Sequence, residues 1–277
     1  MIKIAFQGER GAFSEIAAKK LFGNNISISP SFSFEEVFLK VKDKKVNCGV
    51  VPIENSLYGS VFETYDLLLQ NSLSIIGELN LQINHHLLAN ENYELNEIKK
   101  VYSHPQALGQ CSLFLKTLKN ARLFPAYDTA GSALISLKDT QIPTAAVASR
   151  NAAELYGLKI LKSNIQNNKE NFTRFLVISK KKITKGFHNP KTSICFELKS
   201  IPGALFKALS VFALRDINLL KIESRPIPHK LFEYVFYMDL SGNMEDTKVK
   251  NALNHLSEIS LTLKSFGSYE AGKIFKS

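Results

Sequence analysis

The chain alternates short apolar, β-branched runs with longer segments in which apolar residues recur every three or four positions. The helical spacing is clear at Phe13, Ala17 and Leu21. Five short runs of the first two thirds are typical of strands: residues 2–6, 47–51, 101–102, 123–126 and 145–148. This alternation predicts an α/β fold, with a mainly parallel sheet covered by helices on both faces.

The periodicity stops at residues 180–190, a cationic stretch that contains Gly186 and Pro190, as is typical of a linker. Beyond it, the pattern predicts strands at 192–198, 217–224, 232–240 and 260–265, and helices at 203–214 and 245–256. The order βαββαβ is the ferredoxin-like topology. A length of 277 residues also suits two domains. We therefore expect domains at 1–180 and 191–277, joined by a linker at 181–190.

The net charge of +10 suggests at first a nucleic-acid partner. Only six of the 35 basic residues are Arg, however, and they are spread along the chain. Nucleic-acid sites favour clustered Arg with interleaved aromatic residues. We therefore expect a Lys-rich solvated surface and no nucleic-acid partner.

Targeting signals and paired cysteines are not evident. No apolar run approaches the roughly 20 residues that a membrane helix needs, and the N-terminus lacks the apolar stretch and cleavage site of a secretory signal. Cys48, Cys111 and Cys195 lie far apart in apolar or helical stretches, which favours buried thiols over a disulfide or a zinc site. We expect a cytoplasmic protein without membrane contact.

Polar runs follow four of the predicted strands, at residues 7–14, 52–60, 103–108 and 128–132. The carboxyl ends of strands in an open α/β sheet face one ligand crevice, so these runs should converge. Each run also begins a helix, and the N–H groups at a helix start favour an anion. The pattern predicts a site for a carboxylated or phosphorylated small molecule.

Cofactor and metal motifs are not found in these runs. The Gly spacing does not match the dinucleotide fingerprint, and no phosphate-binding loop occurs. His85 and His86 fall in a predicted strand, where adjacent side chains point to opposite faces and cannot chelate one metal. His104, next to Pro105, is equally compatible with a helix cap and with a site residue.

An arginine opens the last apolar strand of the first domain, within the segment Thr173, Arg174 and Phe175. A cation at the start of a buried strand is costly to desolvate unless an anion meets it. An Arg at a sheet edge in water is the alternative, but it accounts for neither Thr173 nor Phe175. We favour an Arg whose planar guanidinium binds a carboxylate.

Taken together, these motifs resemble the prephenate dehydratase family over nearly the whole chain. The second domain resembles the ACT regulatory domain of that family. The matching segments are 7–14, 52–56, 103–108, 128–130, 146–149 and 173–175, followed by 203–205 and 223–226 in the second domain. Their number and order make the resemblance specific.

The resemblance implies a catalytic domain of two α/β lobes, like a type II periplasmic binding protein, with the second lobe at about 80–160 and the site between the lobes. It implies conversion of prephenate to phenylpyruvate with loss of water and CO2, a step towards phenylalanine. It also implies inhibition by L-phenylalanine bound to the ACT domain at a subunit interface, and a homodimer or homotetramer.

The chemistry of prephenate fits this interpretation. The substrate is a dianion, and losing CO2 and hydroxide makes its ring aromatic. The protein has to hold one carboxylate, leave the departing one poorly stabilised and donate a hydrogen bond to the leaving hydroxyl. We therefore expect no cofactor, no metal and no covalent nucleophile.

By position, the resemblance assigns catalytic roles to Thr173, Arg174, Phe175 and Glu54. Thr173 would donate to the leaving hydroxyl, Arg174 would bind a carboxylate, and Phe175 would pack on the ring. Glu54 would repel a dianion, so it should be protonated or held in structural hydrogen bonds. The expected substrate-binding residues are Ser14, Asn55, Ser56, Ser103, His104, Gln106 and Thr129. The expected phenylalanine-binding residues are Gly203, Ala204, Leu205, Glu223, Ser224, Arg225 and Pro226.

Two alternatives stay open at this point. Arogenate dehydratase performs the same chemistry on a substrate with an amino group in place of the keto group. A non-enzymatic amino-acid sensor would bind a ligand without loss of CO2. Because the sequence starts directly at the first strand, we also expect no chorismate mutase segment in this polypeptide.

Overall fold

The computed structural model describes residues 1–139, 141–227 and 230–276. The predicted domain ranges include 140, 228–229 and 277, which lie outside the described residues. Within the described ranges, no helix is long and apolar enough to cross a membrane.

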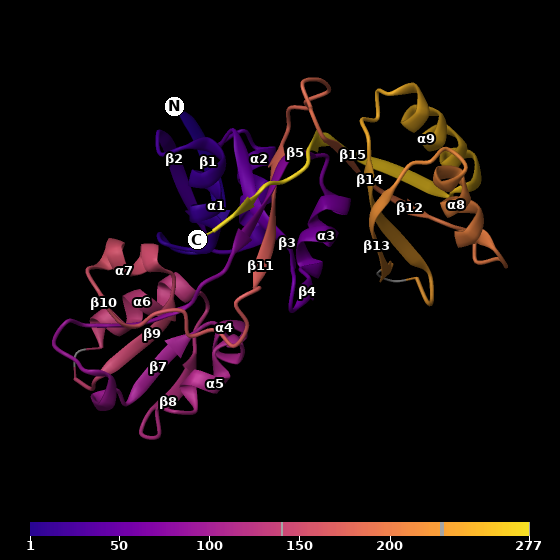
Figure 1. Cartoon of the computed structure of the whole chain (residues 1–277). Helices are drawn as coiled ribbons and strands as arrows, with labels where there is room; N and C mark the ends of the chain where they lie inside the picture. The colour runs from indigo at the N-terminus through magenta and orange to yellow at the C-terminus, as the bar shows by residue number, and fades with distance from the viewer. Residues whose placement is uncertain (140, 228–229, 277) are drawn as a thin grey trace. The chain divides into compact units, whose positions relative to one another are not determined.

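The chain forms two compact units (Figure 1). The first unit comprises Met1–Leu67, Leu79–Phe175 and the tail from Ile274. The second comprises Leu68–Glu78 and Leu176–Lys273. The predicted domain boundaries at 180 and 191 stay a prediction.

The first lobe is built on a seven-stranded sheet in the order β16-β5-β11-β3-β1-β2, with β4 beside β3. Strand β1 pairs in parallel with both β2 and β3. Helices α1 and α2 pack on these strands. The elements are β1 (Ile2–Gln7), α1 (Phe13–Phe22), β2 (Ile26–Ser31), α2 (Phe34–Lys42), β3 (Cys48–Asn55), β4 (Gly59–Ser60), α3 (Phe62–Gln70), β5 (Ser74–Gln82), β11 (Phe172–Ser179) and β16 (Ile274–Phe275).

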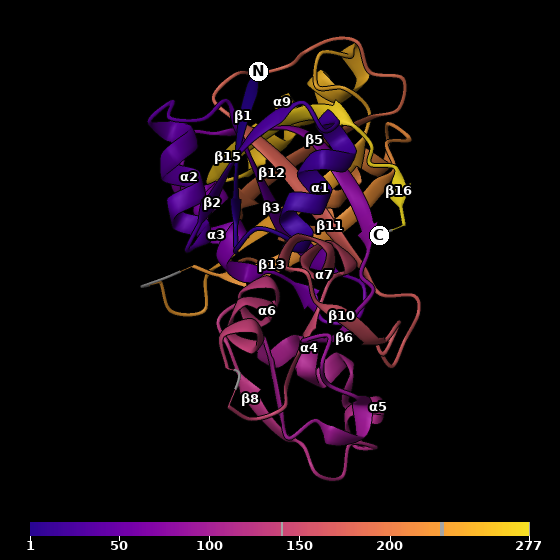
Figure 2. The same cartoon turned by 90° about the vertical axis from the view of Figure 1, so that its left-hand side faces the viewer.

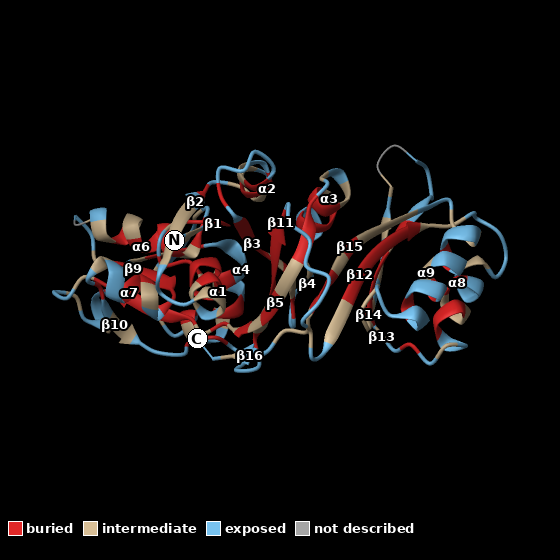
Figure 3. Cartoon of the chain, turned by 90° about the horizontal axis from the view of Figure 1, so that it is seen from above, coloured by how far each residue is buried: buried red, intermediate tan, exposed pale blue. Residues whose placement is uncertain are grey.

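The second lobe is built on a five-stranded sheet in the order β10-β6-β9-β7-β8. This lobe occupies the lower part of the view in Figure 2. Its elements are β6 (His86–Ala89), η1 (Leu95–Glu97), β7 (Lys100–Ser103), α4 (Pro105–Gln110), α5 (Ser112–Leu115), β8 (Arg122–Pro125), α6 (Thr129–Lys138), β9 (Thr144–Ala148), α7 (Arg150–Tyr156) and β10 (Lys159–Lys162). All five residues of β9 are buried, as Figure 3 shows. Helices cover both faces of the strand: Ala146 packs in the core with α6 and α7, and Val147 in the core with α4 and α5. A strand buried on both faces has to be apolar throughout.

The chain crosses between the lobes twice, from β5 to β6 and from β10 to β11. The two crossing segments hydrogen-bond to each other: the Ile83 N–H donates to the Asn171 carbonyl at 2.7 Å, and the Ile165 N–H donates to the His85 carbonyl at 2.9 Å. The strand that follows each crossing lies inside its sheet rather than at the edge: β6 in the second lobe and β11 in the first. The prediction of two binding-protein-like α/β lobes is confirmed.

The second unit contains the predicted βαββαβ order, and its sheet runs β13-β14-β12-β15. Its elements are β12 (Pro190–Glu197), α8 (Ala204–Ala213), β13 (Leu219–Pro226), β14 (Tyr234–Ser241), α9 (Thr247–Ile259) and β15 (Thr262–Glu270). Ile194, Phe196 and Met238 on one sheet face share a core with Phe212 of α8 and Leu256 of α9. The ferredoxin-like prediction is therefore confirmed.

The sequence pattern did not predict five of the strands: β2, β4, β5, β10 and β16. Strand β2 alternates Ile and Ser but contains Pro30, which cannot donate to a sheet ladder and suits the edge position that β2 occupies. His85, expected in a strand with His86, instead lies in the first crossing segment, because β6 begins at His86.

Candidate active site

A cavity of about 550 Å³ lies in the first unit and is lined by residues of both lobes. All four polar runs reach it: those at 7–14 and 52–60 follow strands of the first lobe, and those at 103–108 and 128–132 follow strands of the second. The polar lining residues include Gln7, Ser14, Asn55, Ser60, His104, Gln106, Asp128, Thr129 and Thr173. The volume suits a small organic molecule.

One part of the cavity wall is apolar. Ala12, Phe13, Ile83, Ala107 and Phe175 all line it. The Phe175 side chain is almost fully buried, with 2% exposure. This wall can pack against a ring while the polar residues contact its substituents.

Asn55 fixes the direction in which the Thr173 hydroxyl can donate. Its Oδ1 accepts from the N–H groups of Leu57 and Tyr58, at 3.0 and 3.1 Å. Its Nδ2 must then face the other way, where it donates to Asn171 Oδ1 at 2.8 Å and to Thr173 Oγ1 at 3.0 Å. Because Thr173 Oγ1 accepts from Asn55, its own proton is left for a different acceptor.

Arg174 and Glu54 lie on the opposite sheet face from Thr173. Neighbouring residues of a strand point to opposite faces, and Thr173 and Phe175 line the cavity whereas Arg174 does not. Arg174 Nη1 lies 4.0 Å from Glu54 Oε2, and the side chains are 11% and 34% exposed. The role expected for Glu54 stays a prediction.

Ser56 and Ser103 do not line the cavity. The Ser56 hydroxyl donates to the Glu170 carbonyl at 3.0 Å and accepts from the Phe172 N–H at 2.9 Å, so it ties β3 to the start of β11. The Ser103 hydroxyl is fully buried and donates to the Val147 carbonyl at 2.6 Å. Both hydroxyls hold strand ends in place.

His104 caps a helix and also lies in the cavity lining. Its Nδ1 caps α4 by accepting from the Gln106 N–H at 3.3 Å, and its side chain lines the cavity. Burial lowers the pKa of His104, although the nearby Asp128 carboxylate partly raises it. A neutral ring that accepts at Nδ1 carries its proton on Nε2.

The start of α1 is the helix end best suited to an anion in the cavity. Its N-cap residue, Ala12, provides no side-chain hydrogen bond, and Phe13 and Ser14 line the cavity. At α6, by contrast, the Asp128 carboxylate already accepts from the Gly131 N–H at 3.1 Å. Uncapped N–H groups at a helix start attract a carboxylate.

His85 and Gln110 line the cavity although the sequence analysis did not select them as site residues. His85 Nε2 lies 2.7 Å from Gln110 Oε1. Burial lowers the pKa of His85 to about 4, so the ring is neutral and its Nε2–H donates to Gln110. The spacing could have revealed Gln110, since it lies one helical turn after Gln106 on α4.

Asp128 is a further lining residue that was not selected, although the sequence analysis placed it at the start of a polar run. Its Oδ2 accepts from the Gly131 N–H and, at 3.0 Å, from the Glu9 N–H.

Across residues 1–139, 141–227 and 230–276, no group of three His, Cys, Asp or Glu side chains is placed to hold a metal ion.

The predicted phenylalanine-binding residues lie in the second unit, at the start of α8 and the end of β13. Gly203 is the N-cap of α8, with φ of 75° and no side-chain cap, and Ala204 begins the helix. Ser224 pairs with Phe236, which packs against the helix-side core, whereas Glu223 pairs with Tyr237. Directly paired residues share a sheet face, so Ser224 lies on the helix side and Glu223 on the other. The other predicted phenylalanine-binding residues are Leu205 of α8 and Arg225 and Pro226 of β13.

Comparisons with known proteins agree over nearly the whole chain. Residues 4–183 match the family model described as Prephenate dehydratase, and residues 192–258 match the ACT domain. A protein of Arabidopsis thaliana described as arogenate dehydratase/prephenate dehydratase 2 is 44% identical over 97% of this chain and 72% of its own length.

Two solved structures share the fold. A prephenate dehydratase of Arthrobacter aurescens in complex with L-Phe has a TM-score of 0.90 and 32% identity, over 97% of this chain and 90% of that one. A structure described as GqqA, a novel type of quorum quenching acylase, has a TM-score of 0.88 and 31% identity, over 98% of both chains.

Proposed function

Because the chain belongs to the prephenate dehydratase family and carries an ACT domain, we propose that it converts prephenate to phenylpyruvate with loss of water and CO2. The cavity supports this proposal, since it combines an apolar wall with polar groups from both lobes. Phe175 would pack on the ring. Gln106, Thr129 and Ser14 would contact its polar substituents.

The observation that carries the proposal is the direction of the Thr173 proton. Asn55 donates to Thr173 Oγ1, so the Thr173 O–H is free to donate to the hydroxyl that leaves the ring. Accepting one hydrogen bond also makes a hydroxyl a stronger donor. The pKa of an alcohol is too high for Thr173 to act as a free acid, so it acts by hydrogen bonding or through a water.

The cavity would stabilise one of the two carboxylates of prephenate more than the other. The uncapped start of α1 at Phe13 and Ser14 can hold one of them. The described lining of the cavity contains no Lys or Arg. The departing carboxylate therefore meets no cation there that would stabilise it against loss as CO2. Direct contact between Arg174 and a carboxylate stays a prediction, and it requires Arg174 to leave the sheet face on which the structure places it.

Substitution of Thr173 and Asn55 tests this proposal. Thr173→Val removes the donor, and we expect kcat for phenylpyruvate formation to fall about 10²- to 10³-fold, as when an oxyanion donor is lost. Thr173→Ser is the matched control and should stay within about tenfold of wild type. Asn55→Asp should lower kcat about as much as Thr173→Val does, because the Thr173 O–H would then donate its hydrogen bond to the new carboxylate. A fully active Thr173→Val would refute the role.

Arogenate is the alternative substrate, since relatives carry both names. Initial rates of the purified protein on prephenate and on arogenate decide between the two. Turnover of arogenate alone would overturn the main assignment. Because an acylase shares the fold at similar identity, prephenate turnover has to be measured directly rather than inferred from the fold.

We propose that L-phenylalanine inhibits the enzyme by binding at the ACT domain. The uncapped start of α8 at Gly203, Ala204 and Leu205 can take the carboxylate of an amino acid. Ser224 shares the sheet face on which α8 packs. A solved relative contains L-Phe, which supports this ligand.

We further propose a homodimer or homotetramer assembled through the ACT domain. Strand β13 lies at the edge of its sheet. Leu220 and Ile222 on this strand are 46% and 43% exposed, and Phe206 of α8 is 76% exposed. An edge strand with exposed apolar residues favours pairing with another chain. Sedimentation velocity should therefore show no monomer at micromolar concentration; a monomer would contradict the proposal.

A cytoplasmic location is also proposed. Cys48, Cys111 and Cys195 are free and buried, and free thiols are usual in a reducing compartment. Fractionation of the source cells tests the location.

A further inference from the structure

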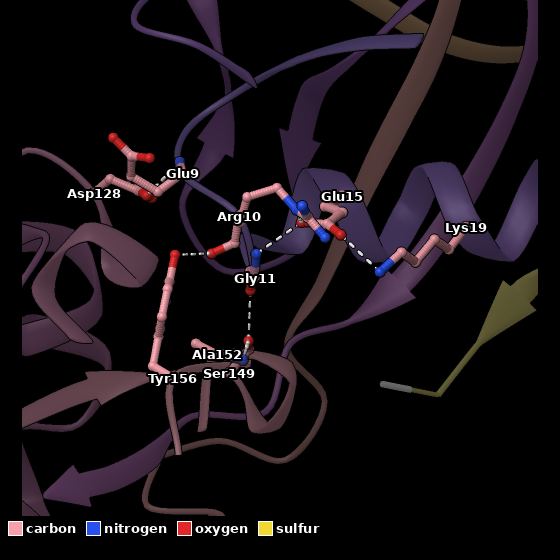
Figure 4. Close-up of polar contacts among 9 residues, drawn as sticks. All are labelled: Glu9, Arg10, Gly11, Glu15, Lys19, Asp128, Ser149, Ala152 and Tyr156. Atoms are coloured by element: carbon pink, nitrogen blue, oxygen red, sulfur yellow. Dashed lines mark hydrogen bonds and ion pairs between the residues drawn. The ribbon is translucent and has the colours of Figure 1, made fainter. Parts of the chain in front are cut away.

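A loop of the first lobe lies directly on the second lobe, beside the cavity. It comprises residues 8–12, between β1 and α1, and is called the β1–α1 loop below. The Glu9 N–H donates to Asp128 Oδ2 at 3.0 Å (Figure 4). Ser149 Oγ donates to the Gly11 carbonyl at 2.7 Å, and Tyr156 Oη donates to the Arg10 carbonyl at 2.7 Å. Three groups of the second lobe therefore hold three consecutive residues of the first.

The contact is too close to allow a side chain at Gly11. A Cβ there would lie 2.9 Å from the Ala152 Cα, a backbone atom that cannot move aside cheaply. The φ of 89° at Gly11 is also a conformation that residues with a side chain rarely adopt. The β1–α1 loop and α7 thus pack backbone against backbone.

The loop is equally well fixed on its own lobe. Glu15 of α1 is 1% exposed, and its Oε2 accepts from the Gly11 N–H at 2.8 Å and lies 3.3 Å from Arg10 Nε. Its other oxygen lies 2.6 Å from Lys19 Nζ. Burial opposes ionisation, but the hydrogen bonds and charges of these groups more than offset it and lower the pKa of Glu15. The loop is therefore held by hydrogen bonds from its own lobe as well as from the second lobe.

We propose that the β1–α1 loop is an interlobe latch that sets the width of the cavity. Besides this loop, the lobes share the two crossing segments near Ile83 and Asn171, which form a hinge, and side-chain packing such as that of Phe32 on Tyr127. The latch adds hydrogen bonds to the loop backbone on the cavity side, next to Ser14 and Asp128 of the lining. Tyr156 and Gly11 do not line the cavity, so they are positioning residues.

The latch predicts a particular kinetic signature. If the binding-competent closed state becomes less populated, the apparent affinity for substrate falls in proportion, while the closed complex still reacts. Losing one neutral hydrogen bond lowers the ratio of closed to open molecules about two- to tenfold. A Cβ at Gly11 should lower it further, because the latch then cannot seat.

Paired variants test the latch by kinetics. Gly11→Ala combined with Tyr156→Phe should raise KM at least about fivefold and change kcat less than about twofold. Gly23→Ala is the control for backbone strain, since Gly23 has φ of 76° in the same lobe but nothing within 4 Å of a Cβ. Tyr102→Phe, a hydroxyl deletion at a ring stacked on Phe124, is the control for Tyr156→Phe.

A distance measurement tests the latch without any substrate. Spin labels at Lys20→Cys on the first lobe and Lys119→Cys on the second attach selectively, because all three native cysteines are buried. Double electron–electron resonance should show one distance in the otherwise wild-type protein and an added or broader population in Gly11→Ala/Tyr156→Phe. An unchanged distribution, or a fall in kcat with KM unchanged, would overturn the latch. The kinetic arm rests on the proposed function, whereas the distance arm does not.

Discussion

Asn55 is a neutral residue that determines what a neighbouring hydroxyl can do. Two backbone N–H groups hold its Oδ1, so its Nδ2 faces Thr173. The Thr173 proton is thereby directed away from Asn55 without any charged group. An uncharged residue suits this position, because a carboxylate in contact with a dianionic substrate would repel the substrate.

Buried histidines predict how the stability of the protein depends on pH. Burial lowers the pKa of both His85 and His86 to about 4, from 6.5. The unfolded chain therefore takes up protons between pH 6.5 and 4 that the folded protein does not. We expect the free energy of unfolding to fall as the pH drops through this range, by on the order of 2 kcal/mol for fully buried His85.

Urea unfolding at a series of pH values measures this effect. His85→Gln and His86→Gln should each flatten the slope between pH 6.5 and 4. His255→Gln, at an exposed position on α9, is the matched control and should leave the slope unchanged. Equal slopes in all four proteins would show that these rings do not carry the pH dependence.

At the scale of elements, helix α3 depends on a lysine far along the sequence. Lys264 Nζ of β15 donates to the carbonyls of Leu68, Leu69 and Asn71 at 2.9, 2.7 and 2.8 Å. These carbonyls lie at or just beyond the C-terminal end of α3, where the helix has no internal partners for them. One ammonium group thus satisfies three acceptors and complements the negative end of the helix.

Removing the Lys264 ammonium group should lower the free energy of unfolding. Lys264→Met keeps the apolar part of the side chain but leaves the three carbonyls without their donor, so we expect a loss of about 2 kcal/mol in the free energy of unfolding. Lys264→Arg should retain part of the stability. Lys248→Met serves as the control, because Lys248 is half exposed and lies 3.9 Å from an exposed Asp216 carboxylate. Similar unfolding midpoints for the two Met variants would contradict the capping role.

For the whole molecule, the proposed inhibition places a ligand carboxylate at the start of α8. Gly203→Asp would put a negative charge there, and nothing lies within 4 Å of a Cβ at this position. We expect the concentration of L-phenylalanine that halves the initial rate to rise about tenfold or more. Gly203→Asn is the matched control, since Asn and Asp tolerate the φ of 75° similarly but only Asp is charged. Equal inhibition of the two variants would rule out carboxylate binding at this turn.

Local pattern was sufficient to predict much of the fold. Apolar periodicity located the central strands, such as β9, and the complete βαββαβ order of the second unit. It did not locate edge strands such as β2, because a short run with a proline has little apolar signal. Strand direction also predicted that each polar run lies at the carboxyl end of its strand, but these strands belong to two sheets, so the runs meet only because the two lobes face each other.

Local sequence thus determined which elements form and at which strand ends the polar runs lie, because backbone periodicity and strand direction are properties of short stretches. Tertiary structure alone decided which face of each strand lines the cavity. Strand alternation turned Arg174 and Glu54 to the face opposite Thr173, and a buried carbonyl took up the Ser103 hydroxyl. The contact of Gly11 with Ala152 is likewise invisible in the sequence, since the two residues meet only when the lobes pack together.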